Sequence, residues 1–197
     1  MATFRTSQPG SAADPALPHL ILVGLPGAGK STVAAMLARR LGRTFLDFDT
    51  EISRREGLSI AEIFAQHGEP AFRRMEHALT EEVALFGGMV LAPGGGWVSQ
   101  GDTVALLRPS ARLIYLKISP AGALRRMGRK VAGRPLLLRP DPCGELERLL
   151  AARRLVYESA DLVVDVENID SQRVTDKIQA HFAPPIVPQD GRGSAGC

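Results

Sequence analysis

The chain has 197 residues, of which 45% are hydrophobic and 23% charged, as expected for one globular domain with a buried core. Its net charge of +3, with no basic run interleaved with aromatic residues, argues against nucleic-acid binding. No apolar run approaches the roughly 20 residues that a membrane span requires. We therefore expect no membrane partner. Cys143 and Cys197 fit neither a disulfide framework nor zinc spacing, so we expect a protein of the reducing cytoplasm.

Both ends of the chain differ in composition from the middle. Residues 1–18 are rich in Ala, Ser, Pro and Gly and lack the apolar segment of a signal peptide. From residue 184 to 197, prolines give way to a glycine-rich end. We therefore expect two flexible tails, 1–18 and 184–197, around a single domain over residues 19–183.

Residues 24–32 read Gly-Leu-Pro-Gly-Ala-Gly-Lys-Ser-Thr and match the phosphate-binding pattern G-x-x-x-x-G-K-[ST]. In such a loop, backbone N–H groups surround phosphate oxygens, Lys30 reaches the β- and γ-phosphates, and the Ser31 hydroxyl ligates Mg²⁺. An aliphatic run at 19–23 precedes the loop, and apolar residues at helical spacing follow it up to Gly42. We therefore predict a nucleoside triphosphate site. Its loop residues are Gly27, Ala28, Gly29, Lys30, Ser31 and Thr32.

A second short strand is predicted at 44–47, and it ends in Asp47-Phe48-Asp49. Ligands bind beyond the carboxyl ends of the strands in an open parallel sheet. One aspartate could therefore help hold Mg²⁺ and the other could meet a substrate hydroxyl. Alternatively, the pair caps the next helix. The spacing alone leaves both interpretations open.

Two helical segments follow. The first is short and opens with a capping box at residues 59–62, and after a turn at 67–68 a longer one carries an apolar stripe as far as Phe86. Arg73 and Glu76 lie on one face of the longer helix. They form either an ordinary surface ion pair or an arginine held by a carboxylate so that its guanidinium meets a substrate carboxylate.

The third predicted strand, 89–92, leads into Gly94, Gly95 and Gly96. These glycines either let the backbone approach a ligand closely or form a flexible turn. A Walker B strand would end in aspartate, but this one ends in Pro93. Asp47 is therefore our candidate carboxylate for Mg²⁺.

A fourth strand at 112–118, a helix at 144–159, a fifth strand at 161–166 and a helix at 169–182 complete the pattern. Between the fourth strand and the helix at 144–159, the residues from about 125 to 142 are rich in arginine, glycine and proline. This composition is typical of a mobile lid over a polyphosphate. The predicted fold class is α/β. It is a five-stranded parallel sheet flanked by helices, the three-layer α/β/α arrangement of P-loop NTPases, with a mobile lid.

Over residues 19–182 the chain resembles the shikimate kinase family of P-loop proteins. The resemblance is carried by Phe45–Ile52, Gly57–Phe64, Gly68-Glu69 and Phe72–Glu76, in that order. It implies ATP-dependent phosphorylation of the 3-hydroxyl of shikimate, with Mg²⁺ as cofactor and ATP as co-substrate. Nothing in the sequence requires more than a monomer.

The resemblance also implies roles for individual residues. Asp49 would bind the ring hydroxyls and help orient or deprotonate the attacking one. Asp47 would hold Mg²⁺ through water beside Ser31. Arg73 and Arg153 would bind the shikimate carboxylate, Glu76 would steady the site, and the three glycines would approach the substrate. Lys30 and the lid residue Arg134 would stabilise the transferring phosphoryl group, and Arg126 would lie over the adenine.

The chain departs from the family pattern at two places. Trp97, its only tryptophan, follows the glycines where the family has a small or aliphatic residue. The indole either packs into the core behind the loop or reshapes the acceptor pocket. The lid is also about one residue longer before Arg134, which bears on the placement of Arg126. The alternatives to shikimate phosphorylation are a related kinase with another acceptor, such as gluconate, and a non-catalytic nucleotide- or metabolite-sensing domain.

Overall fold

The computed structural model describes residues 16–128 and 140–182. The expected tails lie almost wholly outside these residues, and so do Arg134 and most of the expected lid.

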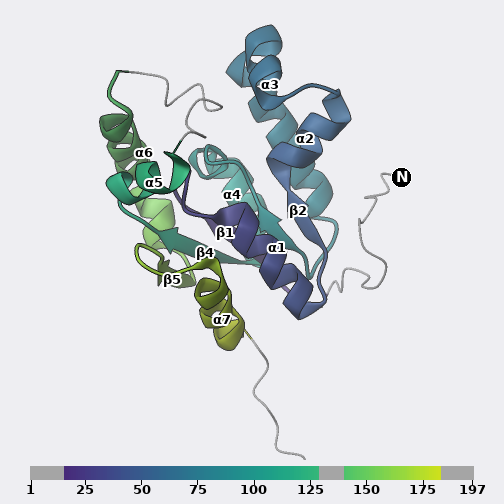
Figure 1. Cartoon of the computed structure of the whole chain (residues 1–197). Helices are drawn as coiled ribbons and strands as arrows, with labels where there is room; N and C mark the ends of the chain where they lie inside the picture. The colour runs from purple at the N-terminus through teal and green to yellow at the C-terminus, as the bar shows by residue number, and fades with distance from the viewer. Residues whose placement is uncertain (1–15, 129–139, 183–197) are drawn as a thin grey trace, which may run out of the picture.

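Five parallel strands form one sheet in the order β2-β3-β1-β4-β5 (Figure 1). They are β1 (His19–Val23), β2 (Phe45–Asp47), β3 (Val90–Ala92), β4 (Ala111–Lys117) and β5 (Leu162–Asp165). The register pairs Asp47 with Ala92, the last residues of β2 and β3. The chain segments that follow these two strands therefore begin side by side, next to the loop that follows β1.

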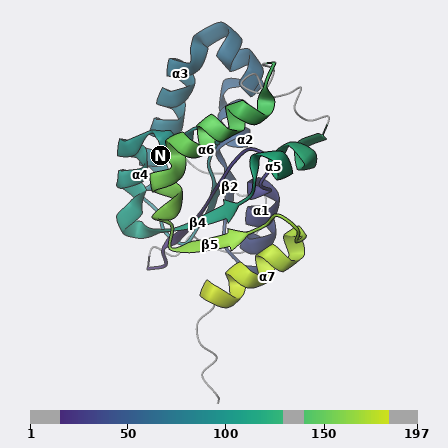
Figure 2. The same ribbon diagram turned by 90° about the vertical axis from the view of Figure 1, so that its left-hand side faces the viewer.

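Seven α-helices occur within the described residues. They are α1 (Lys30–Leu41), α2 (Phe48–Glu56), α3 (Ile60–Val83), α4 (Gly101–Leu107), α5 (Pro120–Met127), α6 (Pro142–Glu158) and α7 (Ser171–Phe182). Two 3₁₀ turns, η1 (Trp97–Ser99) and η2 (Arg108–Ser110), flank α4. The sheet lies between α1 and α7 on one side and α3, α4 and α6 on the other (Figures 1 and 2). The predicted three-layer α/β/α fold is confirmed.

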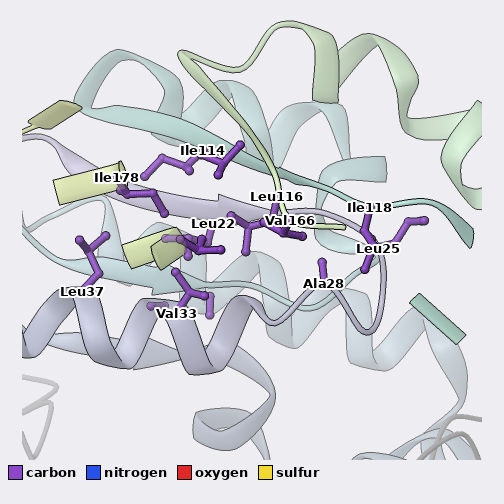
Figure 3. Packing of buried hydrophobic residues seen from close by; sticks show 14 of the residues in the cluster. Leu22, Leu25, Ala28, Val33, Leu37, Ile114, Leu116, Ile118, Val166 and Ile178 are labelled. Atoms are coloured by element: carbon purple, nitrogen blue, oxygen red, sulfur yellow. The ribbon is translucent and has the colours of Figure 1, made fainter. Parts of the chain in front are cut away.

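Alternation along the buried strands builds a separate apolar core on each face of the sheet, because successive strand side chains point to opposite faces. Leu20 and Leu22 of β1 pack with residues of α1 and α7, and Figure 3 shows Leu22 among Val33, Leu37 and Ile178. Ile21 and Val23 belong to the other cluster, together with side chains of α3, α4 and the end of α6. The sheet is covered on both faces, as its nearly continuous aliphatic strands predict.

Local sequence signals explain several helix boundaries. Gly42 ends α1 in the left-handed region at φ 63°. Ser59 and Glu62 form the predicted capping box of α3. Gly68, at φ 75°, interrupts α3 where the sequence predicts the turn between two helical segments.

Two helices were not expected, α4 and α5. Both are short, and α5 has only Gly122, Ala123 and Met127 buried, so each offers too few apolar positions to be recognised from the sequence. Arg125 and Arg126 lie in the last turn of α5, and α6 begins at Pro142, so both ends of the segment 125–142 are helical. Nowhere in residues 16–128 or 140–182 is there a helix both long and apolar enough to cross a membrane.

Candidate nucleotide and acceptor site

The phosphate loop connects β1 directly to α1. Gly24 and Gly27 have positive φ values of 147° and 86°, which residues with a side chain rarely adopt. A Cβ atom at Gly27 would lie 2.6 Å from the carbonyl oxygen of Ala123, and one at Gly24 would lie 2.6 Å from that of Leu116. These two glycines are therefore required by conformation and by space, because the loop is packed closely against β4 and α5.

Lys30 is the first residue of α1, and its ammonium group points back over the loop. The Nζ atom donates to the carbonyl oxygens of Gly24 at 3.0 Å and Leu25 at 3.2 Å. The positive charge thus lies at the helix N-terminus, where anions are already favoured.

Asp47 and Ser31 meet at the predicted metal position. The Ser31 hydroxyl donates to Asp47 Oδ2 at 2.5 Å, while the other oxygen, Oδ1, accepts from the backbone N–H of Thr50 at 3.0 Å. Asp47 is therefore the N-cap of α2 and a neighbour of the phosphate loop, so the two interpretations that the spacing left open are compatible.

The oxygen ligands that Ser31 and Asp47 offer suit Mg²⁺, but they do not form a metal site made of protein ligands alone. A hydroxyl and one carboxylate are typical of Mg²⁺ that completes its shell with phosphate oxygens and water. The described residues contain no cluster of three or more His, Cys, Asp or Glu side chains that could hold a metal.

Asp49 lies in the first turn of α2 and reaches the glycine segment that follows β3. A Cβ atom built on Gly94 would lie 2.8 Å from Asp49 Oδ1 and 2.7 Å from Glu76 Oε1. Two carboxylate oxygens from α2 and α3 therefore border one point, where only glycine leaves room.

Arg73 is held between two carboxylates of its own helix. Its Nη1 donates to Glu76 Oε2 and its Nη2 donates to Glu69 Oε1, both at 2.6 Å. A Cβ atom on Gly96 would overlap the guanidinium, so the arginine lies directly over the glycine segment. A carboxylate thus fixes Arg73 in place, and the contact of its guanidinium with a substrate carboxylate stays a prediction.

Arg153 approaches the same segment from α6. Its side chain is buried, at 5% exposure, and Nε donates to the hydroxyl of Ser99 at 3.2 Å. Its Nη1 has no hydrogen-bond partner and lies 3.6 Å from the Cβ position of Gly95, which is 3.8 Å from Pro26 of the phosphate loop. A buried guanidinium with an unused donor indicates a missing polar partner.

Glu76 is the most deeply buried acid of the site, with no exposed surface. Burial raises the pKa of its carboxyl, and Arg73 opposes that rise. Burial would lower the pKa of Arg73, but Glu76 and Glu69 outweigh it and raise that pKa. Glu76 Oε1 has no hydrogen-bond partner and borders the same space as Asp49.

Trp97 is fully buried behind the glycine segment. Its Nε1 donates to the hydroxyl of Thr80 at 2.9 Å, and its ring meets that of Phe48 edge to face at 6.5 Å. The first of the two interpretations, packing into the core, is the one that the structure supports.

Arg126 lies apart from these groups, near the loop after β5. Its Nη2 donates to the carbonyl oxygens of Val166 and Ile169, which ties α5 to that loop. The position is at the carboxyl ends of β4 and β5, beside the phosphate loop.

The structure thus brings Asp49, Arg73 and Arg153 together at the three glycines, next to Lys30, Ser31 and Asp47. Sequence reasoning missed Ser99 and Gln100, whose side chains contact this group. No residue pattern identifies them, because their partners are distant in the chain.

A parallel sheet, a phosphate loop opening a helix, and a lysine and a hydroxyl at that helix N-terminus define a P-loop protein of the α/β class. The sequence profile of the family described as shikimate kinase matches residues 26–183. The chain therefore belongs to the shikimate kinase family, whose members are ATP-dependent phosphotransferases acting on an alcohol group.

Individual relatives agree with this assignment. The chain is 42% identical to a shikimate kinase of Pseudomonas savastanoi pv. phaseolicola, with 85% of this chain and 98% of the relative covered. It is 40% identical to one of Rhodopseudomonas palustris, with 82% and 79% covered. Among solved structures, shikimate kinase from Acinetobacter baumannii in complex with shikimate matches with a TM-score of 0.80 and 35% identity, covering 88% of this chain and 97% of that one.

Proposed function

We propose that this enzyme transfers the γ-phosphoryl group of ATP to the 3-hydroxyl of shikimate, giving shikimate 3-phosphate and ADP. The observation that carries the proposal is the convergence of two arginines and an aspartate on Gly94–Gly96, within contact distance of the phosphate loop. A ring polyol with one carboxylate offers partners for both kinds of group, its carboxylate for the arginines and its hydroxyls for the aspartate.

The arginines give the acceptor its orientation. Arg73 and Arg153 bind the carboxylate, and the unused Nη1 donor of Arg153 supports this role. Their placement on two helices fixes the ring at one end, while the backbone of Gly94, Gly95 and Gly96 lies along it. The opposite end, with its hydroxyls, then faces Asp49.

Asp49 prepares the nucleophile. Its carboxylate accepts a hydrogen bond from the attacking hydroxyl and takes the proton as the oxygen attacks the γ-phosphorus. The bond from that phosphorus to the bridging oxygen of ADP breaks, and ADP leaves with that oxygen. The attacking and leaving oxygens lie in line with the phosphorus. Most of the rate enhancement comes from positioning and charge neutralisation.

The nucleotide lies along the phosphate loop, from Gly27 to Thr32. Lys30 turns from the loop carbonyls toward the β- and γ-phosphates, and Arg126 lies over the adenine. Arg134, outside the described residues, would reach the transferring group from the lid. Asp47 and Ser31 would hold Mg²⁺, which would supply positive charge against the charge of the phosphate groups.

We further propose that the enzyme acts in the cytoplasm, where ATP is available, and as a monomer.

Release of ADP by the purified protein with MgATP tests the proposal, with shikimate, gluconate or no acceptor added. We expect rapid release with shikimate alone. Release only with another acceptor would overturn the proposed substrate, and ATP binding without turnover on any acceptor would overturn the proposed activity.

A further inference from the structure

The residues directly after the three glycines contact both arginines of the acceptor site or their partners. This segment, Trp97–Gln100, consists of η1 and the residue that follows it. It lies between the end of α6 and the middle of α3, which carry Arg153 and Arg73 respectively.

Ser99 holds one of the two arginines. Its hydroxyl accepts a hydrogen bond from Arg153 Nε at 3.2 Å. This bond fixes the planar guanidinium at one edge, and Nη1 lies against Gly95.

Gln100 acts on the other arginine through a carboxylate. Its Nε2 donates to Glu76 Oε2 at 2.8 Å, the same oxygen that accepts from Arg73 Nη1 at 2.6 Å. Two donors therefore meet on one oxygen and leave Oε1 facing Gly94. Without the amide, Arg73 would be the only hydrogen-bond donor to that buried carboxylate among the described residues.

Trp97 fixes the segment to α3. Its indole donates to Thr80, and the Thr80 hydroxyl donates to the backbone carbonyl of Glu76 at 2.7 Å. The segment is thus anchored one helical turn from the carboxylate that Gln100 contacts, which keeps the short amide side chain in register with Glu76.

We propose that Ser99 and Gln100 are positioning residues that set the spacing of Arg153 and Arg73 for recognition of the acceptor's carboxylate. The inference rests on the proposed function of the two arginines. It adds that the η1 segment, which contacts both helices, determines how tightly Arg73 and Arg153 bind one carboxylate. A hydrogen bond to a charged group corresponds to about tenfold or more in a binding constant when it is short, and we expect less from the 3.2 Å bond of Ser99.

Kinetics of Gln100→Leu and Ser99→Ala with shikimate and with its methyl ester test the proposal. The exposed Gln172 on α7 supplies the matched control Gln172→Leu. We expect Gln100→Leu to raise the KM for shikimate about tenfold and Ser99→Ala about threefold, with the KM for ATP unchanged within twofold. Because the ester lacks the carboxylate charge, the preference for shikimate over the ester in kcat/KM should fall by the same factors.

A KM for shikimate that stays within twofold in both variants would overturn the inference, as would equal losses with shikimate and the ester. If Gln100→Leu does not fold, Ser99→Ala tests the same proposal at the other arginine. Failure of the wild-type enzyme to phosphorylate shikimate would instead count against the proposed function, so the two failures are distinguishable.

Discussion

At the scale of the residue, Asp49 is the group on which the proposed chemistry depends most. It lies in the first turn of α2, and its Oδ1 shares with Glu76 Oε1 the space beside Gly94. On Glu76, the Oε2 atom already accepts hydrogen bonds from Arg73 and Gln100. Asp49 is therefore better suited than Glu76 to accept the proton of a substrate hydroxyl.

We expect Asp49→Asn to lower kcat by about 10²–10⁴-fold, because the amide keeps the shape of the side chain but cannot accept a proton. The affinity for ATP should change less than twofold, since Asp49 faces the acceptor. Coupled ADP release and calorimetric titration with ATP measure the two quantities. A variant that retains more than a tenth of the wild-type kcat would show that another group takes the proton.

Part of the candidate site could be placed from the sequence. Asp49 and the three glycines could be placed together from the sequence, because each follows a strand of a parallel sheet and such strand ends meet at one edge. Ser99 and Gln100 could not, because a serine and a glutamine after a glycine turn are ordinary surface residues by composition. Their partners, Arg153 and Glu76, lie 54 and 24 residues away.

At the scale of the element, the N-terminus of α2 combines two tasks in Asp47. One carboxylate oxygen caps the helix through Thr50, and the other accepts from Ser31 of the phosphate loop. Asparagine is as good an N-cap as aspartate, but it is a neutral and weaker ligand for a hard cation. Substitution can therefore separate the structural task from the proposed metal task.

We expect Asp47→Asn to keep the free energy of unfolding within about 0.5 kcal/mol of wild type, whereas Asp47→Ala should lower it by about 1 kcal/mol. Both variants should need several-fold more Mg²⁺ for half-maximal activity. Urea unfolding and Mg²⁺ titration at fixed ATP supply the measurements. An unchanged Mg²⁺ requirement in Asp47→Asn would leave Asp47 with the capping role alone.

The elements differ in how well the sequence indicated them. The five strands were predicted to within one residue at either end, because continuous aliphatic runs bounded by glycine, proline or aspartate are typical of buried parallel strands. The helices α4 and α5 were missed because each spans about two turns and buries few side chains. For the same reason the sequence did not indicate that the basic segment at 125–142 is helical at its ends.

At the scale of the whole molecule, His19 links the start of the central strand to the end of the α3–β3 connection. Its Nε2–H donates to the carbonyl oxygen of Phe86 at 3.0 Å, and its Nδ1 accepts from the N–H of Met89 at 3.3 Å. The ring is fully buried, and this burial lowers the pKa of His19 below 6.5. A proton on Nδ1 would remove the acceptor for Met89.

The unfolded chain binds that proton more tightly than the folded one, so the contribution of His19 to stability is complete above about pH 6.5. It should be lost as the pH falls through that value toward the lowered pKa of the folded state, by at most about 1.4 kcal/mol per pH unit. Urea unfolding of wild type and His19→Gln between pH 8 and pH 5 isolates the effect. The free energy of unfolding should rise more steeply with pH in wild type than in His19→Gln over this range. Equal slopes for the two proteins would exclude His19 as the titrating group.

The burial of Trp97 has a consequence for experiment. It is the only tryptophan in the chain, so the fluorescence of the protein excited at the red edge of absorption arises from one indole. That indole follows Gly96 directly and is joined through Thr80 to the backbone of Glu76. We therefore expect occupation of the proposed acceptor site to change the emission of Trp97, which stopped-flow fluorescence would measure without a label.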